Sequence, residues 1–277
     1  MRPPLIGPTG PPDLHVMTFN VRRRLRVAWR PADRWRHRKG AVAALLRTER
    51  PTLLGAQETL PDQVAVLREA LGAGYRSLGY PRRGTAGAES NPILFDEERL
   101  ELREWHQYAL SDQPERRGSR SWGNLIARAV VIARLRDRAT GAEFVALNTH
   151  LDHLSAQSRL RSAQELRRRI AQLRLPAIVT ADFNAPVSSP AVRHLLQDGA
   201  LADAWSAASE RLTPAWGTFP NYTRPRVGAK RIDGILVTSD IAVARAAVNA
   251  TRIDGRWPSD HMPVQALVRV PVAGGSS

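Results

Sequence analysis

The sequence contains no cysteine, which excludes disulfide bonds and thiolate metal ligands from its 277 residues. It also has no run of eighteen apolar residues, so no transmembrane helix is expected. Residues 1–12 are rich in proline and glycine and lack the apolar stretch of a secretion signal. We therefore expect a cytoplasmic protein with no membrane partner.

Lysine is almost absent as well. Only two of the 41 basic residues are lysines, Lys39 and Lys230, and the others are arginines. The net charge of +15 favours an anionic partner such as nucleic acid. However, arginine together with abundant alanine and proline is also what a GC-rich coding sequence produces. The charge alone therefore leaves a nucleic-acid partner open.

The length and the hydrophobic content of 43% fit one domain with a substantial core, and no repeat or long linker divides the chain. Helices are expected at residues 35–47, 62–71, 155–173 and 189–196, with Asp33 capping the first. Strands are expected at residues 14–19, 52–56, 75–80, 92–95, 100–108, 125–135, 143–148, 176–180, 231–237, 242–250 and 264–270. This mixture favours a mixed sheet, or two sheets packed face to face with helices outside.

Six short polar clusters lie at the ends of apolar strands. They are Thr18-Phe19-Asn20, Gln57-Glu58, Asn148-Thr149-His150-Leu151, Ala181-Asp182-Phe183-Asn184, Arg231-Ile232-Asp233 and Ser259-Asp260-His261. Strand ends that meet at one edge of a sheet are a usual place for a ligand site. Carboxylate oxygens suit a hard divalent cation, and imidazoles transfer protons. Together the clusters predict a metal-dependent phosphoesterase.

Each cluster also has a structural interpretation when it is taken singly. In an extended segment Asp182 and Asn184 point the same way, toward one site, but the same pair is typical of an Asx turn. Asn20 alone is typical of a turn, and Glu58 can begin a helix. A single histidine such as His150 more often has a structural role. The functional prediction therefore rests on the whole set.

The ordered clusters resemble the endonuclease/exonuclease/phosphatase superfamily over residues 13–270. The resemblance implies the DNase I-like fold, a four-layer α/β sandwich in which two packed mixed β-sheets are flanked by helices. It implies one catalytic domain at residues 13–271. Residues 1–12 are expected to form a flexible N-terminal segment, and residues 272–277 a disordered tail. The Asn-Thr-His motif at residues 148–150 indicates the DNase I and sphingomyelinase-like branches rather than the abasic-site DNA-repair branch.

The resemblance further implies Mg²⁺- or Mn²⁺-dependent hydrolysis of a phosphate ester by in-line attack of water. It assigns Asn20, Glu58 and Asp260 to the metal site, with Glu58 as the principal ligand. It assigns Asp182 to orienting or deprotonating the attacking water. Asn184 is implied to fix that water or the phosphate.

The remaining roles concern protons and phosphate. By the same resemblance, His261 and Asp233 form an acid/base or phosphate-contacting dyad, and His150 is the second histidine of the site. Glu89 is implied to orient His150. The residues implied to contact phosphate are Arg128, His150, Asn184 and His261.

Two positions depart from the family pattern. Ala181 stands where glycine usually precedes the Asp-Phe-Asn motif, and Gly234 replaces an aromatic residue, which is expected to loosen one wall of the site. Neither change removes a catalytic group.

The substrate stays open at this stage. A monomeric phosphodiesterase or nuclease is expected first, and a phosphomonoesterase of small sugar or inositol phosphates is the alternative. A lipid substrate is not expected, because no apolar loop with exposed aromatic residues is evident. From another class, a non-catalytic nucleic-acid-binding protein would be expected to lack one or more of the site residues, and none is missing.

Overall fold

The computed structural model describes residues 3–85 and 87–272. Its strands are β1 (Leu14–Asn20), β2 (Leu53–Gln57), β3 (Tyr75–Leu78), β4 (Ile93–Asp96), β5 (Leu100–Ala109), β6 (Ala129–Asp137), β7 (Glu143–His150), β8 (Ala177–Asp182), β9 (Leu201–Asp203), β10 (Glu210–Arg211), β11 (Asp233–Thr238), β12 (Ala242–Val248) and β13 (Val264–Arg269). Its helices are α1 (Trp35–Glu49), α2 (Pro61–Leu71), α3 (Ala156–Leu173), α4 (Pro190–Leu196) and α5 (Ala204–Ala207), with short 3-10 helices η1 (Pro31–Asp33) and η2 (Gln197–Gly199).

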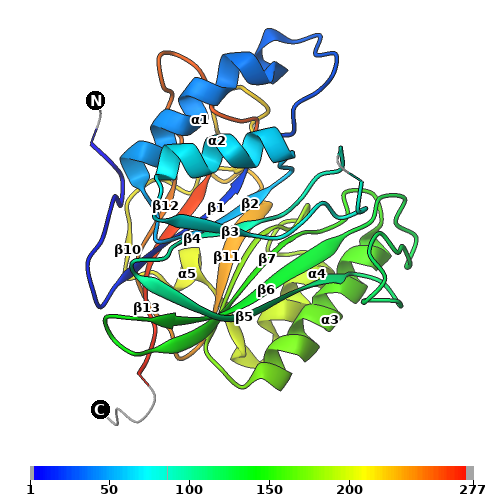
Figure 1. The fold of residues 1–277 in the computed structure, drawn as a ribbon, viewed down its shortest axis with the longest axis vertical. Helices are drawn as coiled ribbons and strands as arrows, with labels where there is room; N and C mark the ends of the chain where they lie inside the picture. Colours follow the sequence, from blue (N-terminus) through cyan, green and yellow to red (C-terminus); the bar gives the residue numbers. More distant parts are fainter. Residues whose placement is uncertain (1–2, 86, 273–277) are drawn as a thin grey trace.

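These strands form two mixed sheets. The first has the order β10-β12-β13-β1-β2-β4-β3, and the second has the order β5-β6-β7-β8-β11-β9. The pairs β1/β2, β7/β8 and β10/β12 are parallel, and the other pairs are antiparallel. Helices α1 and α2 cover the first sheet, and α3 and α4 cover the second (Figure 1). The predicted four-layer sandwich is confirmed.

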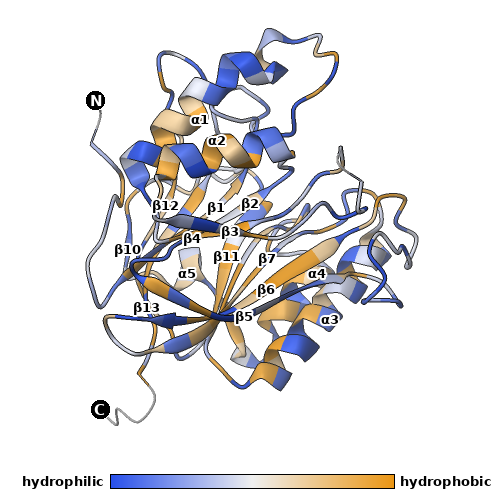
Figure 2. Cartoon of the chain, viewed as in Figure 1, coloured by the Kyte–Doolittle hydropathy of each residue, from blue (hydrophilic) through white to orange (hydrophobic). Residues whose placement is uncertain are grey.

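The alternation of side chains along each strand builds this layering. In β1, Leu14 and Val16 face the core between the sheets, whereas Met17 and Phe19 face α1 and α2. Apolar residues run along the strands and along the helix faces turned toward them, and polar residues lie on the outer helix faces (Figure 2). Burial of both faces explains why central strands such as β2 and β8 read as nearly continuous apolar runs.

Helix α3 shows how the sequence sets an element's ends. Ser155 is its N-cap, and its hydroxyl accepts a hydrogen bond from the backbone N–H of Ser158 at 3.0 Å. Leu166 is fully buried against the second sheet, while the arginines of α3 lie mostly outside that contact. No helix in the described residues is long and apolar enough to cross a membrane.

Some elements differ from the prediction. Asp33 does not cap α1, because it ends η1 and accepts hydrogen bonds from Arg22 and Tyr222 instead. The strand expected from residue 125 begins at Ala129, and the one expected from residue 231 begins at Asp233. The short elements β9, α5 and β10 were not predicted, since two to four residues carry too little periodicity to be recognised.

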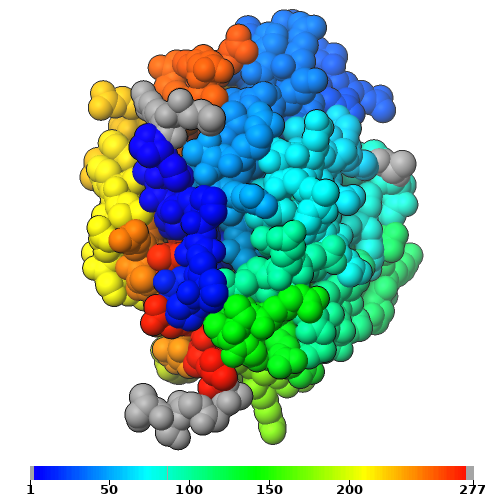
Figure 3. All heavy atoms as spheres, turned by 60° about the vertical axis from the view of Figure 1, so that its left-hand side comes forward, coloured from blue at the N-terminus to red at the C-terminus, as the bar shows by residue number. Residues whose placement is uncertain are grey.

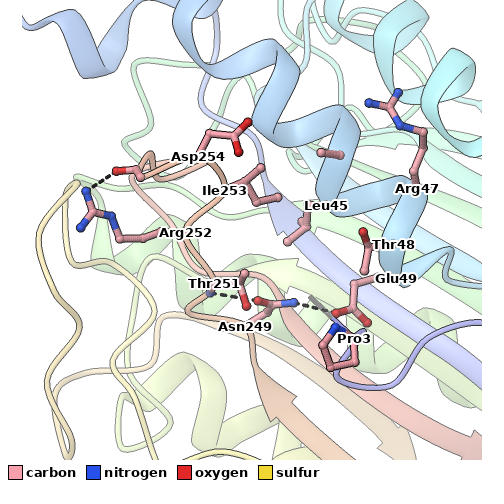
Figure 4. Close-up of a pocket in the computed structure, with 12 residues that line it drawn as sticks. Pro3, Leu45, Arg47, Thr48, Glu49, Asn249, Thr251, Arg252, Ile253 and Asp254 are labelled. Carbon is pink, nitrogen blue, oxygen red and sulfur yellow. Dashed lines mark hydrogen bonds between the residues drawn. The ribbon is translucent and has the colours of Figure 1, made fainter. Parts of the chain in front are cut away.

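Residues 3–12, where the sequence predicts a flexible segment, lie along the surface of the domain (Figure 3). The buried carboxylate of Glu49 accepts hydrogen bonds from the backbone N–H groups of Leu5, Ile6 and Gly7 at 2.9–3.2 Å. The side chain of Asn249 donates to the same carboxylate at 3.0 Å (Figure 4). Residues 273–277 of the expected tail lie outside the described residues.

Candidate active site

The faces of five strands that look into the space between the sheets change from apolar to polar at one end of the sandwich. There Asn20 ends β1, Asp182 ends β8 and Asp233 begins β11, which runs antiparallel to β8 with Asp233 opposite Asp182. The polar side chains on these faces are Thr18, Asn20, Gln57, Asn148, His150, Thr180, Asp182 and Asp233. The strand-end clusters therefore converge, as the sequence predicts.

The deeper members of this group join the two sheets. The Gln57 side chain donates hydrogen bonds to Thr18 Oγ1 at 3.0 Å and to Asn148 Oδ1 at 2.7 Å. Asn148 in turn donates to the carbonyl oxygens of residues 56 and 92. A Cβ atom on Gly55 would lie 2.0 Å from Thr180 Oγ1, so glycine is required for this close approach of the sheets. Gln57 and Asn148 thus hold the two sheets together next to the strand ends that carry the site.

His261 is held between two carboxylates. Its Nδ1 donates to Asp233 Oδ2 at 2.9 Å, and its Nε2 lies 3.9 Å from Asp182 Oδ2. Burial opposes the charged ring, but the two carboxylates prevail and raise the pKa of His261 to about 10. The ring of Phe219 packs on this imidazole, with 4.7 Å between the ring centroids. His261 is therefore a cation at neutral pH.

Asp182 lies at the centre of the cluster. Its carboxylate accepts a hydrogen bond from Asn20 Nδ2 at 2.9 Å and another from the backbone N–H of Asn184 at 2.9 Å. Burial and the nearby Asp233 raise the pKa of Asp182 to about 7. A carboxylate with a pKa in this range is suited to accept a proton from water near neutral pH.

His150 has the opposite electrostatic setting to His261. Burial and the guanidinium groups of Arg128 and Arg82 lower its pKa well below the ordinary value. The Asn184 side chain donates to His150 Nε2 at 2.8 Å, which fits a neutral ring. The two histidines of the site thus carry different charges.

The residues expected at the metal site also lie together. Asn20 Nδ2 is 3.0 Å from Glu58 Oε1, and the guanidinium of Arg22 lies 3.5 Å from Asp260 and 4.0 Å from Glu58. Burial opposes ionisation of Glu58, but Asn20 and the charges of His261 and Arg22 lower its pKa. The site combines the ionised carboxylate of Glu58, the buried carboxylate of Asp260 and the amide of Asn20. These acids already attract the guanidinium of Arg22, and such a group of ligands fits a hard divalent ion.

A second set of potential ligands lies beside them. The side chains of Asp182, Asp233 and His261 offer ligand atoms within 4.8 Å of one another, an arrangement consistent with a metal site. Asn20 bridges the two sets, because its amide contacts both Glu58 and Asp182. The Glu58 set was predicted from the sequence, whereas the other arises because strand pairing places Asp233 beside Asp182.

Strain marks the same positions. Glu58 and Asn184 have backbone φ angles of 59° and 50°, in the left-handed region that residues other than glycine rarely adopt. Non-glycine residues in this region cluster at functional sites, where the surrounding structure holds them.

Gly234 makes room for Phe183, whose ring would lie 3.2 Å from a Cβ at this position. The wall expected to be loose is therefore packed.

Glu89 has a different contact from the one implied by the resemblance. Its carboxylate pairs with Arg82 at 2.6 Å and with Arg23 at 3.0 Å. His150 Nδ1 has no hydrogen-bond partner among residues 3–85 and 87–272. The predicted orientation of His150 by Glu89 is not seen, because the neighbouring arginines occupy the carboxylate.

Sequence reasoning missed three residues on this side. Arg128 Nε lies 3.3 Å from Asp152 Oδ2, and Arg128 Nη2 donates to His153 Nδ1 at 2.9 Å. Asp152 and His153 follow the Asn-Thr-His motif after one intervening residue, Leu151, and this proximity was a usable signal. The sequence contains no signal for Arg82, since its pairing with Glu89 depends on the turn between them.

These side chains surround a pocket of about 400 Å³. Its lining includes the basic residues Arg82, Arg128 and His153 as well as Asp182 and His261. A larger cavity of about 650 Å³ lies between α1 and residues 249–255 (Figure 4). We place the chemistry in the smaller pocket, because the converging acids and imidazoles are there.

Residues 17–261 match the Endonuclease/Exonuclease/phosphatase family. The chain belongs to this family. It is therefore a phosphoesterase with the DNase I-like fold, and its substrate is a phosphate ester. No curated protein sequence matches the chain.

Solved structures of the family share the fold. An endonuclease/exonuclease/phosphatase family protein from Bacteroides thetaiotaomicron is 27% identical, with a TM-score of 0.88 over 95% of this chain and 100% of that chain. A mannosyl-6-phosphatase from the same organism is 27% identical, with a TM-score of 0.85 over 92% and 99% of the two chains. TDP2 from D. rerio, solved with a single-strand DNA product, is 18% identical, with a TM-score of 0.72 over 94% and 100%. This last likeness shows the fold alone.

Proposed function

We propose that this chain is a Mg²⁺- or Mn²⁺-dependent phosphatase that hydrolyses small phosphate monoesters of the sugar phosphate kind. The observation that carries the proposal is the hydrogen-bonded group of Asn20, Asp182, Asn184 and His150, with charged His261 beside it, in a pocket of about 400 Å³. This volume lies in the range of about 300–1,000 Å³ that is usual for small-molecule sites. The similarity to a mannosyl-6-phosphatase supports the same substrate class.

In the proposed mechanism, Asp182 orients the attacking water and accepts its proton. Asn184 holds the water or the phosphate, and neutral His150 contacts a phosphate oxygen. His261, kept protonated by Asp233, donates a hydrogen bond to the oxygen on which negative charge develops. Preorganised donors of this kind typically contribute more to the rate than any other single effect.

The metal would be held by Glu58 and Asp260, whose carboxylate oxygens fit Mg²⁺ or Mn²⁺, together with the amide of Asn20 beside Glu58. When bound there, it would supply positive charge that stabilises the phosphate and the leaving oxygen. We assign it to Glu58 rather than to the Asp182–Asp233–His261 set because a protonated imidazole already neutralises that set. The choice between the two cations is left to the assay.

A nuclease is the second candidate, and the net charge of +15 favours it. Phosphate release from hexose 6-phosphates, inositol phosphates and p-nitrophenyl phosphate would be compared with cleavage of plasmid DNA and structured RNA, in Mg²⁺ and in Mn²⁺. The Asp182→Asn variant, purified in parallel, reports contaminating activity. Turnover of small esters with intact DNA supports the phosphatase, and cleavage of DNA or RNA without phosphate release contradicts it.

A further inference from the structure

Two buried arginines line the pocket without a role in activating water or holding a metal. Arg82 and Arg128 are 7% and 2% exposed. One side of each guanidinium is anchored, with Arg82 Nη2 at 2.6 Å from Glu89 and Arg128 Nε at 3.3 Å from Asp152. On both residues Nη1 is buried and has no hydrogen-bond partner in the described part of the chain.

Unpaired donors on buried charged groups are costly, and each one in a folded protein calls for an explanation. Here there are two of them, on arginines that both line one pocket and come from different segments of the chain. The groups that anchor the two arginines leave Nη1 of each guanidinium without a partner among the described residues, and guanidinium N–H groups bind phosphate oxygens with defined geometry. The missing partner that fits both donors is an oxyanion.

Glu89 explains why Arg82 stays in place. Its two oxygens bind Arg82 and Arg23, and the backbone N–H of Arg82 donates to the Glu89 carbonyl at 2.9 Å. Arg23 is half exposed, so its charge is partly screened by water. Arg82 is enclosed and keeps its direct effect on an anion in the pocket.

We propose that Arg82, positioned by Glu89, binds the substrate phosphate beside Arg128 and makes the enzyme selective for dianionic monoesters over monoanionic diesters. This inference rests on the proposed phosphatase function and deepens it. A monoester dianion offers three terminal oxygens and two charges, whereas a diester offers two oxygens and one charge. The additional oxygen and charge are what Arg82 recognises.

The first test compares Arg82→Met with Arg76→Met, a control arginine whose ion pair with Glu97 is exposed on the edge strand β3. We would measure kcat/KM for p-nitrophenyl phosphate and for bis-p-nitrophenyl phosphate in the Mg²⁺-loaded proteins. Loss of a charge-assisted hydrogen bond predicts a decrease of about 10- to 100-fold for the monoester. The decrease for the diester should be at least about tenfold smaller, because the diester lacks the second charge and the third terminal oxygen that Arg82 is proposed to bind.

Equal decreases for both substrates, or no decrease for the monoester, would overturn the selectivity. Arg82→Lys serves as the second variant, because it keeps the charge but lacks the planar fork. It should recover part of the selectivity while folding like the wild type by circular dichroism. Arg76→Met should leave the ratio of the two substrates at the wild-type value.

The second test does not need turnover. Calorimetry of inorganic phosphate binding to the Mg²⁺-loaded protein at pH 5.5 and pH 8 should show tighter binding at pH 8, where the dianion prevails. In Arg82→Met this preference for pH 8 should be lost. If the protein binds phosphate in an Arg82-dependent way but has no hydrolytic activity, the proposed function is contradicted and the anion site is supported. If the wild type hydrolyses phosphate monoesters but Arg82→Met binds phosphate with an unchanged pH preference, the anion site is contradicted and the proposed function is supported.

Discussion

Neighbouring charges give the two histidines of the pocket different protonation states. His261 lies between Asp233 and Asp182 and has a pKa raised to about 10, whereas His150 faces guanidinium groups and has a lowered pKa. The sequence identified both residues as candidates but could not tell the acid from the base. For His150 the shift depends on burial, on Arg128 and on Arg82, and Arg82 lies 68 positions before His150 and belongs to no motif.

The raised pKa of Asp182 gives a prediction for stability. Its folded-state pKa of about 7 exceeds the ordinary 3.8, so the folded protein keeps a proton that the unfolded chain releases between these values. As pH rises through this window the wild type should therefore lose the stability that the protonated Asp182 contributes, and Asp182→Asn lacks this pH-dependent contribution. From pH 5 to pH 8, the variant should gain about 1–3 kcal/mol relative to the wild type. Urea unfolding of the metal-free proteins measures this, and a constant difference would contradict the charge assignment.

Secondary-structure elements bring the site together through close contacts that pattern alone does not reveal. The polar ends of the strands were readable from the sequence, and so was helix α3, which was expected at residues 155–173. The need for glycine at position 55 was not readable, because it comes from Thr180 on a strand of the other sheet. The contact of Asn148 with Gln57 also joins different sheets and has no local signal.

Gly55→Ala is expected to destabilise the protein, since the new Cβ would lie 2.0 Å from Thr180 Oγ1. Overpacking of this kind costs about 1–3 kcal/mol, or more where both neighbours are fixed. Gly40→Ala is the matched control, because nothing lies within 4 Å of a Cβ at this exposed helical position. The control should gain about 0.5–1 kcal/mol. Thermal unfolding of both variants measures these stabilities. Similar values for the two would show that the sheets are not in tight contact at residue 55.

At the scale of the whole molecule, residues 3–12 are tied to the domain through Glu49 and do not contribute to the pocket. Their composition, rich in proline and glycine, predicts flexibility, but the buried carboxylate that binds them lies about forty residues away in the sequence. The net charge is likewise a property of the whole chain, and it does not identify the substrate. The monomeric state and the cytoplasmic location stay predictions.

Glu49→Ala should lower the free energy of unfolding by about 2–4 kcal/mol, because four buried or partly buried donors would lose their acceptor. Glu69→Ala, an exposed position on α2, is the control and should change it by less than about 0.5 kcal/mol. Equal effects in urea unfolding would mean that the N-terminal residues are not held by this carboxylate. Hydrolysis should persist in the folded fraction of Glu49→Ala.

The central claim is that Asp182 and a divalent metal act together on a phosphate ester. The most direct measurement is phosphate release by the wild type and by Asp182→Asn after treatment with EDTA and again after addition of Mg²⁺ or Mn²⁺. The wild type should lose activity with the chelator and recover it with metal, while the variant should stay about 10²–10⁴-fold slower, the usual contribution of a positioned proton acceptor. Hydrolysis that continues without metal, or that survives unchanged in Asp182→Asn, would contradict the account.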